Sequence, residues 1–309
     1  ETFFDRLTRG SGVYGLAAMA ADQSGGAFGL RLLRPFLTVP GARLKASLVA
    51  RGLSWVDDPS NSNPAYKRVR LRQLQAGLLL EGFDPSRISS TIRRMARAAQ
   101  AIDAAVDVLL KDACAGDVSD FARLDLVRLT PLPEEVRLRL LARLAQHVGG
   151  SLQPPRLDRL EALDARLLAG GPLRVTLAGA VFDVSAGGRM RLWPEPGRSL
   201  PAAVELLPGQ CVHWDGRYRI CLKPDVKGSL RIMPVAQLRQ DEALREEVRT
   251  LARASGFPTA AFARLPAVMR LEGGGKNGTA CLAWTLPREP GLVLRRTGDQ
   301  VLSAMMPDN

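Results

Sequence analysis

Apolar residues at three- and four-residue spacing dominate the middle of the chain. The longest such run covers residues 88–109, which predicts one amphipathic helix beginning near Asp84-Pro85. Two further runs, 136–144 and 157–167, are each followed by a pair of glycines. Because glycine adopts the left-handed backbone of a helix end without strain, these pairs predict where both helices stop. Leucine stripes of this kind are typical of a core, so they indicate no cofactor site.

Alternating apolar and polar positions predict strands in the second half of the chain. Residues 173–177 and 181–184 predict a hairpin, and a linker is expected at Pro194–Gly197. Segments 211–214 and 218–222 flank Asp215-Gly216, a dipeptide that favours a tight hairpin turn. The remaining predicted elements are strands at 190–193, 230–233, 280–284 and 292–294 and a charged helix at 241–255.

Residues 31–72 combine a short helix, a turn and a basic helix. The first helix ends at Gly52, and Leu53–Val56 alternates as a strand whose Trp55 is expected to be buried against Leu44 and Leu48. Asp57–Pro64 is a dense turn signal. In the helix that follows, Leu71, Leu74 and Leu78 share one face, and Arg68, Arg70 and Arg72 flank its edges.

The net charge is +12, and it is concentrated at the two ends of the chain. Residues 1–75 carry +6, residues 76–195 carry +1 and residues 196–309 carry +5. A polyanion that touches both ends, most commonly a nucleic acid, is one interpretation of this pattern. A solubility effect or the arginine preference of a GC-rich genome explains the excess equally well, so charge alone does not decide.

Composition excludes several classes of protein. No apolar run approaches the roughly 18–20 residues that span a bilayer. The four cysteines lack zinc-finger spacing, and they are expected to be reduced, as in a cytoplasmic protein. With two histidines in the whole chain, a hydrolase based on a Ser-His-Asp or Cys-His arrangement is disfavoured.

Three segments in order resemble the tRNA(Ile)-lysidine synthetase family of the PP-loop ATP-pyrophosphatase superfamily. They are Arg34-Pro35, then the turn Gly52–Asn61 with its Trp-Val-Asp-Asp-Pro-Ser-Asn run, and then Tyr66–Arg72. The resemblance extends upstream to Glu1-Thr2 and the Arg9–Gly12 loop. Val69 departs from the pattern, because the family commonly has asparagine there.

The resemblance implies a multidomain α/β and α fold. Residues 1–75 would be the C-terminal part of a Rossmann-like PP-loop catalytic domain. Residues 76–195 would be a mainly helical middle domain with a terminal β-hairpin, and residues 196–309 a small mixed α/β domain that contacts tRNA. The match in this last domain is architectural only.

The resemblance also implies an activity, in which ATP adenylates the wobble cytidine of tRNA(Ile) and free lysine then displaces AMP. Mg²⁺ would accompany ATP, and no membrane is involved; homodimer formation is left open. By resemblance, Glu1 would bind lysine. Arg9, Gly10, Ser11 and Gly12 would rim the active site, and Arg34, Arg68, Arg70 and Arg72 would hold tRNA. Asp57 and Asp58 are expected to be structural caps and partners of those arginines.

The family's ATP motif, S-G-G-x-D-S, is not found in this sequence. Ser24-Gly25-Gly26 lacks the aspartate and second serine, and Gly273–Gly275 lacks the spacing of a phosphate loop. We therefore expect the chain to be the downstream part of a longer enzyme and to be inactive alone. A non-catalytic RNA-binding fragment or paralogue remains an alternative, and a tRNA thiolase of the same superfamily is disfavoured because the cysteines show no pairing.

Overall fold

The computed structural model describes residues 1–23, 31–82, 84–115, 120–151, 153–197, 199–238, 240–272, 276–282 and 292–296. These residues form two compact units, which meet in sequence between Ala104 and Ala105. The described residues up to Ala104 belong to the first unit, and those from Ala105 onward belong to the second. The expected division at residues 75 and 195 stays a prediction.

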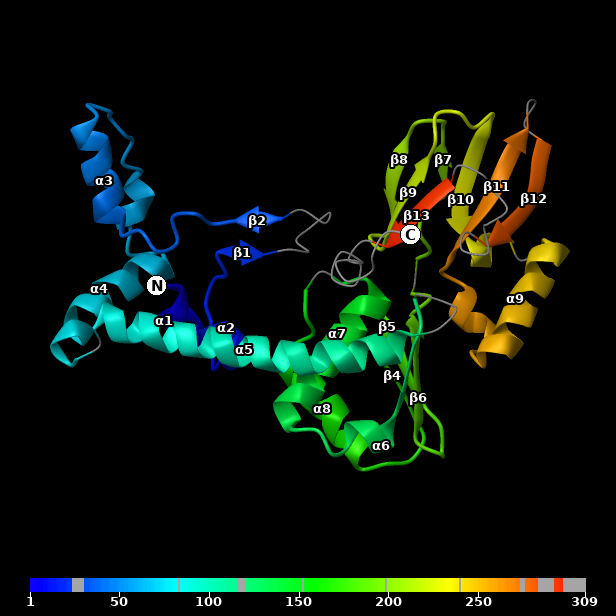
Figure 1. Cartoon of the computed structure of the whole chain (residues 1–309), viewed down its shortest axis with the longest axis horizontal. Coiled ribbons are helices and arrows are strands. Elements are labelled where there is room, and N and C mark those ends of the chain that lie inside the picture. The colour runs from blue at the N-terminus through cyan, green and yellow to red at the C-terminus, as the bar shows by residue number, and fades with distance from the viewer. Residues whose placement is uncertain are drawn as a thin grey trace. The chain divides into compact units, whose positions relative to one another are not determined.

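The first unit is mostly helical, and in Figure 1 it is coloured from blue to cyan. Its elements are α1 (Thr2–Leu7), α2 (Val13–Leu16), β1 (Asp22–Gln23), β2 (Leu32–Leu33), α3 (Gly41–Ala50), a 3-10 helix (Pro59–Ser62), α4 (Lys67–Leu80) and the long α5 (Pro85–Cys114), which continues into the second unit. The two short strands pair antiparallel. Within the described part of this unit, the expected Rossmann-like parallel sheet is therefore not seen.

The long helix α5 begins where the sequence predicts. The Oδ1 atom of Asp84 accepts a hydrogen bond from the backbone N–H of Ser86 at 2.8 Å, which satisfies one of the free donors at the helix start. Its apolar stripe turns inward at Ala99 and Val106, and Val106 is fully buried. Val69 stands where the family commonly has asparagine, and its side chain is buried on α4. An apolar residue suits this buried position.

Three sequence expectations in the first unit are wrong. Leu53–Val56 forms no strand, and Trp55 is 39% exposed instead of buried. On the face of α4 that was predicted to point inward, Leu71 is buried but Leu74 is exposed. Helix α3 has no buried residue at all. The spacing of apolar residues identified the apolar faces of these helices correctly. The faces were expected to be buried, but no described residues cover them fully.

The second unit contains both predicted leucine-rich helices and most of the strands. Beyond α5 its elements are β3 (Ala122–Asp125), α6 (Leu126–Leu129), α7 (Glu134–Gly149), α8 (Leu157–Leu168), β4 (Leu173–Leu177), β5 (Ala180–Val184), β6 (Arg189–Pro194), β7 (Val204–Leu206), β8 (Cys211–Trp214), β9 (Tyr218–Leu222), β10 (Ser229–Pro234), a 3-10 helix (Val235–Leu238), α9 (Glu242–Ser255), a 3-10 helix (Thr259–Phe262), β11 (Pro266–Glu272), β12 (Lys276–Leu282) and β13 (Leu292–Arg296). No helix in the described ranges has the length and apolar character needed to cross a bilayer.

The predicted hairpin of β4 and β5 belongs to a four-stranded antiparallel sheet of order β3-β6-β5-β4. Helix α7 packs on β5 and β6, and its Leu140, Leu141 and Leu144 are fully buried. The linker expected at Pro194–Gly197 is only partly correct. Pro194 ends β6, and the N–H of Glu195 donates to the carbonyl of Gly179 at 2.8 Å, so the sheet extends into this segment.

The C-terminal strands form two antiparallel sheets, β12-β11-β10-β7 and β13-β9-β8. Asp215 and Gly216 both have positive φ, as the predicted β8–β9 turn requires. Cys211 and Cys221 face each other across this hairpin and form a disulfide, so the expectation of reduced cysteines is wrong for this pair. Predicted residues 283 and 284 lie outside the described residues.

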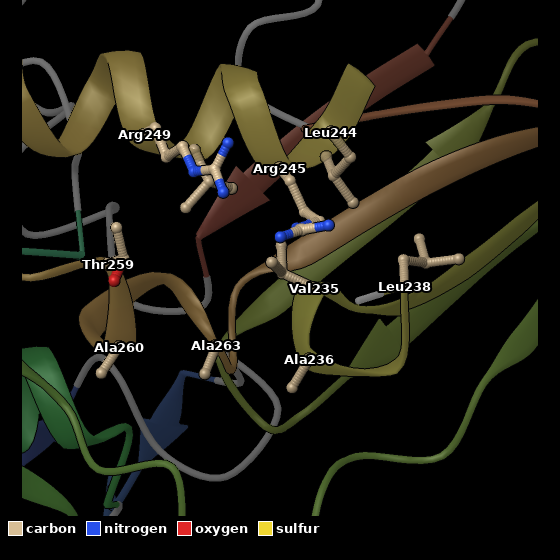
Figure 2. Close-up of a pocket in the computed structure, with 10 residues that line it drawn as sticks. Val235, Ala236, Leu238, Leu244, Arg245, Arg249, Thr259, Ala260 and Ala263 are labelled. Atoms are coloured by element: carbon tan, nitrogen blue, oxygen red, sulfur yellow. The ribbon is translucent and has the colours of Figure 1, made fainter. Parts of the chain in front are cut away.

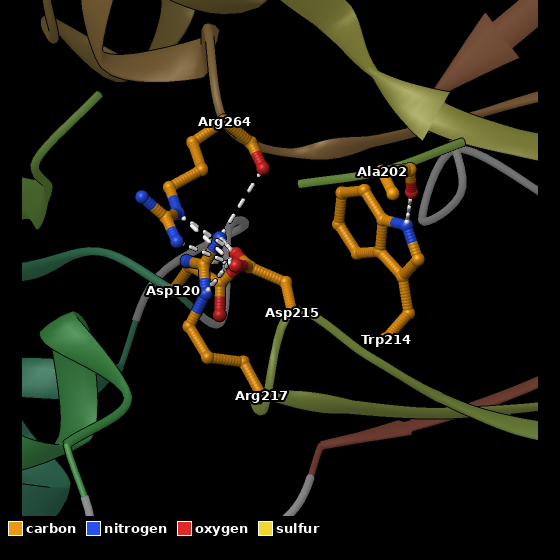
Figure 3. Close-up of polar contacts among 6 residues, drawn as sticks. All are labelled: Asp120, Ala202, Trp214, Asp215, Arg217 and Arg264. Atoms are coloured by element: carbon orange, nitrogen blue, oxygen red, sulfur yellow. Dashed lines mark hydrogen bonds and ion pairs between the residues drawn. The ribbon is translucent and has the colours of Figure 1, made fainter. Parts of the chain in front are cut away.

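A buried charge cluster connects residues of the C-terminal part, Asp215, Arg217 and Arg264, to Asp120, which lies shortly before β3 (Figure 3). Arg217 donates from Nη2 to Oδ2 of Asp215 at 2.6 Å, and Arg264 donates from Nη2 to Oδ1 of the same carboxylate at 2.6 Å. The Nη1 atom of Arg217 lies 3.8 Å from Oδ2 of Asp120, and both side chains are 1% exposed. Gly150, with φ +74°, makes room for this arginine, because an added Cβ would lie 2.3 Å from its Cγ atom.

Candidate functional site

A cleft of about 1130 Å³ lies within the first unit. Its walls come from α1, the segment after α2, the segment before α3, two residues of α4 and the N-terminal half of α5. Most lining groups are apolar, and the charged ones are Glu1, Asp22, Arg68 and Arg93. Mixed lining of this kind, with a few polar groups on an apolar surface, is typical of a small-molecule site.

Glu1 and the basic helix α4 form one charge cluster at this cleft. Arg72 donates from Nε to Oε1 of Glu1 at 2.8 Å, and the Nε atom of Arg68 lies 3.5 Å from Oε2. Both arginines are more than half exposed, whereas the Glu1 side chain is 25% exposed. Ion pairs this exposed contribute little to stability, about 0–1 kcal/mol, so the arginines can exchange this partner for another anion.

The loop Arg9–Gly12 connects α1 to α2. Arg9 pairs with Asp5 one helical turn earlier, with Nη2 and Oδ2 3.0 Å apart. Lys67, at the first position of α4, contacts the same carboxylate at 2.7 Å and donates to Thr8 at 2.9 Å. The hydrogen bond from Lys67 is the main reason why the pKa of Asp5 is lowered, with Arg9 adding to the effect. Asp5 and Lys67 therefore fix α4 against α1 beside Glu1.

Arg34 and Arg70 both use one guanidinium nitrogen on backbone carbonyls. Arg70 donates from Nη1 to the carbonyls of Pro64 and Ala65 at 2.8 and 2.7 Å, which closes the turn before α4. Arg34 donates from Nη1 to the carbonyl of Ala20 at 2.9 Å. Neither side chain lines the cleft. Their contacts orient both guanidinium groups on the surface.

In the acidic turn, Asp58 is a cap, as expected, but Asp57 has a different partner from the one predicted. Asp58 caps the 3-10 helix, since its Oδ1 accepts from the N–H of Ser60 at 2.8 Å, and this hydrogen bond lowers the pKa of Asp58. Asp57 pairs with Lys45 at 3.0 Å and not with an arginine. A hydrogen bond from Lys45 is likewise the main cause of the lowered pKa of Asp57. Lys45 also lies 5.3 Å from the ring centre of Trp55.

Of the predicted site residues, the structure brings Glu1, Arg68 and Arg72 together, and Glu1 and Arg68 line the cleft. Arg9, Gly10, Ser11 and Gly12 lie in their own loop and are not among the lining residues. Sequence reasoning missed Lys67 as the contact between helices. Its place directly before Arg68 in the basic run was the available signal, but its partner Asp5 is 62 positions away.

For the two predicted cofactors, ATP and Mg²⁺, the described residues show no complete binding motif. No group of three or more His, Cys, Asp or Glu residues suited to a metal ion occurs in the described part of the chain. Both glycine-rich segments, Ser24–Gly26 and Gly273–Gly275, lie outside the described residues, and neither has the full phosphate-binding motif. Which residues hold ATP and Mg²⁺ therefore stays a prediction.

Residues 1–76 match the family model of the PP-loop domain. The chain is thus a PP-loop protein of mixed α/β architecture. The residues that line the charged cleft lie inside the matched region, except for Leu78 and those of α5.

Similarity to curated proteins identifies the family within the PP-loop class. The chain is 44% identical over 206 residues to the tRNA(Ile)-lysidine synthase of Methylobacterium nodulans, a match covering 64% of this chain and 60% of the relative. It is 34% identical over 260 residues to the protein of the same name from Ruegeria pomeroyi, covering 84% of this chain and 59% of the relative. The chain belongs to the tRNA(Ile)-lysidine synthase family, and it spans about three fifths of the length of these relatives.

Proposed function

We propose that this chain is part of an enzyme that joins lysine to the wobble cytidine of tRNA(Ile) in an ATP-dependent reaction. The observation that carries the proposal is the cluster of Glu1, Arg68 and Arg72 at the cleft of a PP-loop domain. A carboxylate suited to an ammonium group lies beside cations suited to phosphates, which are the charged groups of lysine and tRNA.

In this proposal the side chains of the chain bind and orient the two substrates. Glu1 accepts the ammonium group of lysine, and its arginine partners turn to the phosphates of the bound tRNA. Arg34 and Arg70 add phosphate contacts from their anchored guanidinium groups. The Arg9–Gly12 loop, joined to α4 through Asp5 and Lys67, would form the rim.

When bound, ATP supplies the leaving group that makes the cytidine reactive. The S-G-G-x-D-S motif is not found in the sequence, and the described residues hold no group of three or more candidate metal ligands, so no step of adenylation is assigned to them. We propose accordingly that the chain alone binds tRNA without transferring lysine.

Transfer of labelled lysine to tRNA(Ile) tests the proposal. The assay compares the chain by itself with a longer protein that adds upstream residues containing the S-G-G-x-D-S motif. We expect transfer by the longer protein only. Activity of the shorter chain contradicts our assignment of adenylation to other residues, and activity of neither favours the non-catalytic RNA-binding alternative.

Two variants of the longer protein separate the roles. Glu1→Gln should raise the lysine concentration needed for half-maximal rate, because the amide loses the charge that attracts ammonium, whereas Arg72→Gln should mainly weaken tRNA binding. Arg159→Gln, an exposed arginine on α8, is the matched control and should change neither value.

A further inference from the structure

A pocket of about 350 Å³ lies in the second unit between α9 and the two 3-10 helices at Val235–Leu238 and Thr259–Phe262 (Figure 2). It is lined by Val235, Ala236, Leu238, Leu244, Arg245, Val248, Arg249, Thr259, Ala260 and Ala263. This volume is near the lower end of the range of about 300–1,000 Å³ that is usual for small-molecule sites. One small group fits, and an extended chain does not.

The wall of the pocket is apolar except at one side. Leu244 and Val248 are buried at 1% and 7% exposure, and they belong to the core that supports α9. Alanines 236, 260 and 263 keep the space open, because each contributes only a methyl group. Apolar ligand surface is therefore favoured inside the pocket.

Two cations stand at the polar side. Arg245 and Arg249 are one turn apart on α9, so their side chains extend over the same face, as Figure 2 shows. Their partners are weak: Arg245 lies 3.5 Å from Glu242 and Arg249 lies 3.2 Å from Glu246, on carboxylate side chains that are 80% and 56% exposed. Solvent screens such pairs, so a phosphate can replace either partner.

We propose that this pocket binds one unpaired nucleotide of RNA, with the base against the apolar wall and the adjacent phosphates on Arg245 and Arg249. An unstacked base offers the flat apolar face that the pocket accepts, and arginine guanidinium planes both stack on bases and bind phosphate. A base inside a duplex cannot enter, because its faces are covered by its neighbours. The inference rests on the proposed function in assigning RNA as the ligand.

Charge favours RNA over an acidic peptide. Residues 196–309 carry +5, and Arg245 and Arg249 line the pocket one turn apart on α9. Two successive phosphates of one strand can meet both of these arginines while a base enters the apolar pocket, whereas an acidic peptide supplies the charges without a base.

Binding of a fluorescein-labelled single-stranded tetranucleotide of uridine, measured against salt concentration, tests the pocket in the full chain. Ala260→Phe fills the space from an exposed position, so it should lower the affinity about tenfold and leave the salt slope unchanged. Replacing Arg245 and Arg249 by Gln should reduce the slope by about 0.7 for each lost phosphate contact. Arg253→Gln is the control on the same helix and should retain the wild-type affinity.

Several outcomes overturn the inference. They are unchanged binding by both the Ala260→Phe and the double-arginine variants, and an equal loss in the Arg253→Gln control. Equal affinity for the same uridines held in a longer, stable duplex, or tighter binding of a tetraglutamate peptide, also overturns it. Circular dichroism and the thermal midpoint establish that each variant is folded, and the double-arginine variant decides alone if Ala260→Phe is not. The assay needs neither ATP nor lysine. Failure of the longer protein to transfer lysine, with tetranucleotide binding intact, therefore contradicts the proposed function and leaves the pocket proposal standing.

Discussion

The Nε atom of Arg72 donates to Oε1 of Glu1 at 2.8 Å, although the two residues are 71 positions apart. This contact joins the residue predicted to bind lysine with a residue predicted to bind tRNA. Arg68 reaches the other carboxylate oxygen at 3.5 Å, so one anion holds two cations. Occupation of Glu1 by lysine would therefore release positive charge toward the phosphates, and the two substrates are expected to favour each other's binding.

The first prediction concerns this coupling in tRNA binding by the chain alone. Glu1→Gln should strengthen binding, because it frees Arg68 and Arg72 from their common partner. Replacing both arginines by Gln should weaken binding and reduce the salt slope by about 0.9 per contact with duplex RNA. Titrations at several salt concentrations measure both effects. If the double-arginine variant keeps the wild-type salt slope, these arginines pair with Glu1 and make no contact with the phosphates.

The parts of the fold that the sequence predicted depend on local signals. Helix α7 stops at Gly149, followed by a left-handed Gly150, and the β8–β9 turn forms at Asp215-Gly216. A glycine stop or an Asp-Gly turn acts within a few residues, so one sequence suffices to recognise it. The disulfide could have been predicted as well, because Cys211 and Cys221 lie five residues before and after the centre of that turn.

The parts that were missed depend on distant partners. Strand β3 pairs with β6 in a register that joins Ala122 to Leu192, and no periodicity encodes such a pairing. Likewise the sequence identified an arginine edge on α4 but not its carboxylate partner, which the fold brings to Arg72 from Glu1. An apolar face also does not reveal what covers it, which is why Trp55 was expected inside and lies outside.

The second prediction compares two tryptophans. Trp55 is 39% exposed, so Trp55→Ala should lower the free energy of unfolding by less than about 1 kcal/mol. Trp193 is 4% exposed and packs edge-to-face with Phe257, so Trp193→Ala should cost roughly 3–5 kcal/mol. Urea unfolding of both variants provides the comparison. A larger loss for Trp55 would mean that its ring is covered in solution.

The third prediction concerns the buried cluster in Figure 3. Arg217→Met should lower the free energy of unfolding by roughly 3–5 kcal/mol, because it leaves Asp120 without this cation and Asp215 with Arg264 alone. Arg156→Gln is the control, since Arg156 pairs with Asp158 and both side chains are more than half exposed, and it should cost less than about 1 kcal/mol. Equal effects in urea unfolding would contradict the distinction between buried and exposed pairs.

The last prediction concerns acid stability and rests on Asp5. The hydrogen bond from Lys67 holds the pKa of this carboxyl below its usual value of 3.8 in the folded chain. A folded-state pKa below the unfolded one means that the unfolded chain binds more protons in this range. Asp5 therefore stabilises the fold above the unfolded pKa, and this contribution is lost as pH falls through the folded pKa.

Asp5→Asn should accordingly lose stability at pH 7 and show a weaker dependence of the urea midpoint on pH between about 5 and 3. Lys67→Met should reproduce that flattening, because it removes the donor that depresses the pKa, even though the carboxyl remains. Arg9→Gln should have a smaller effect, since the contribution of Arg9 to the shift ranks below that of Lys67. If the wild type and Asp5→Asn lose stability in parallel as pH falls, the contact between α1 and α4 through Asp5 does not persist in solution.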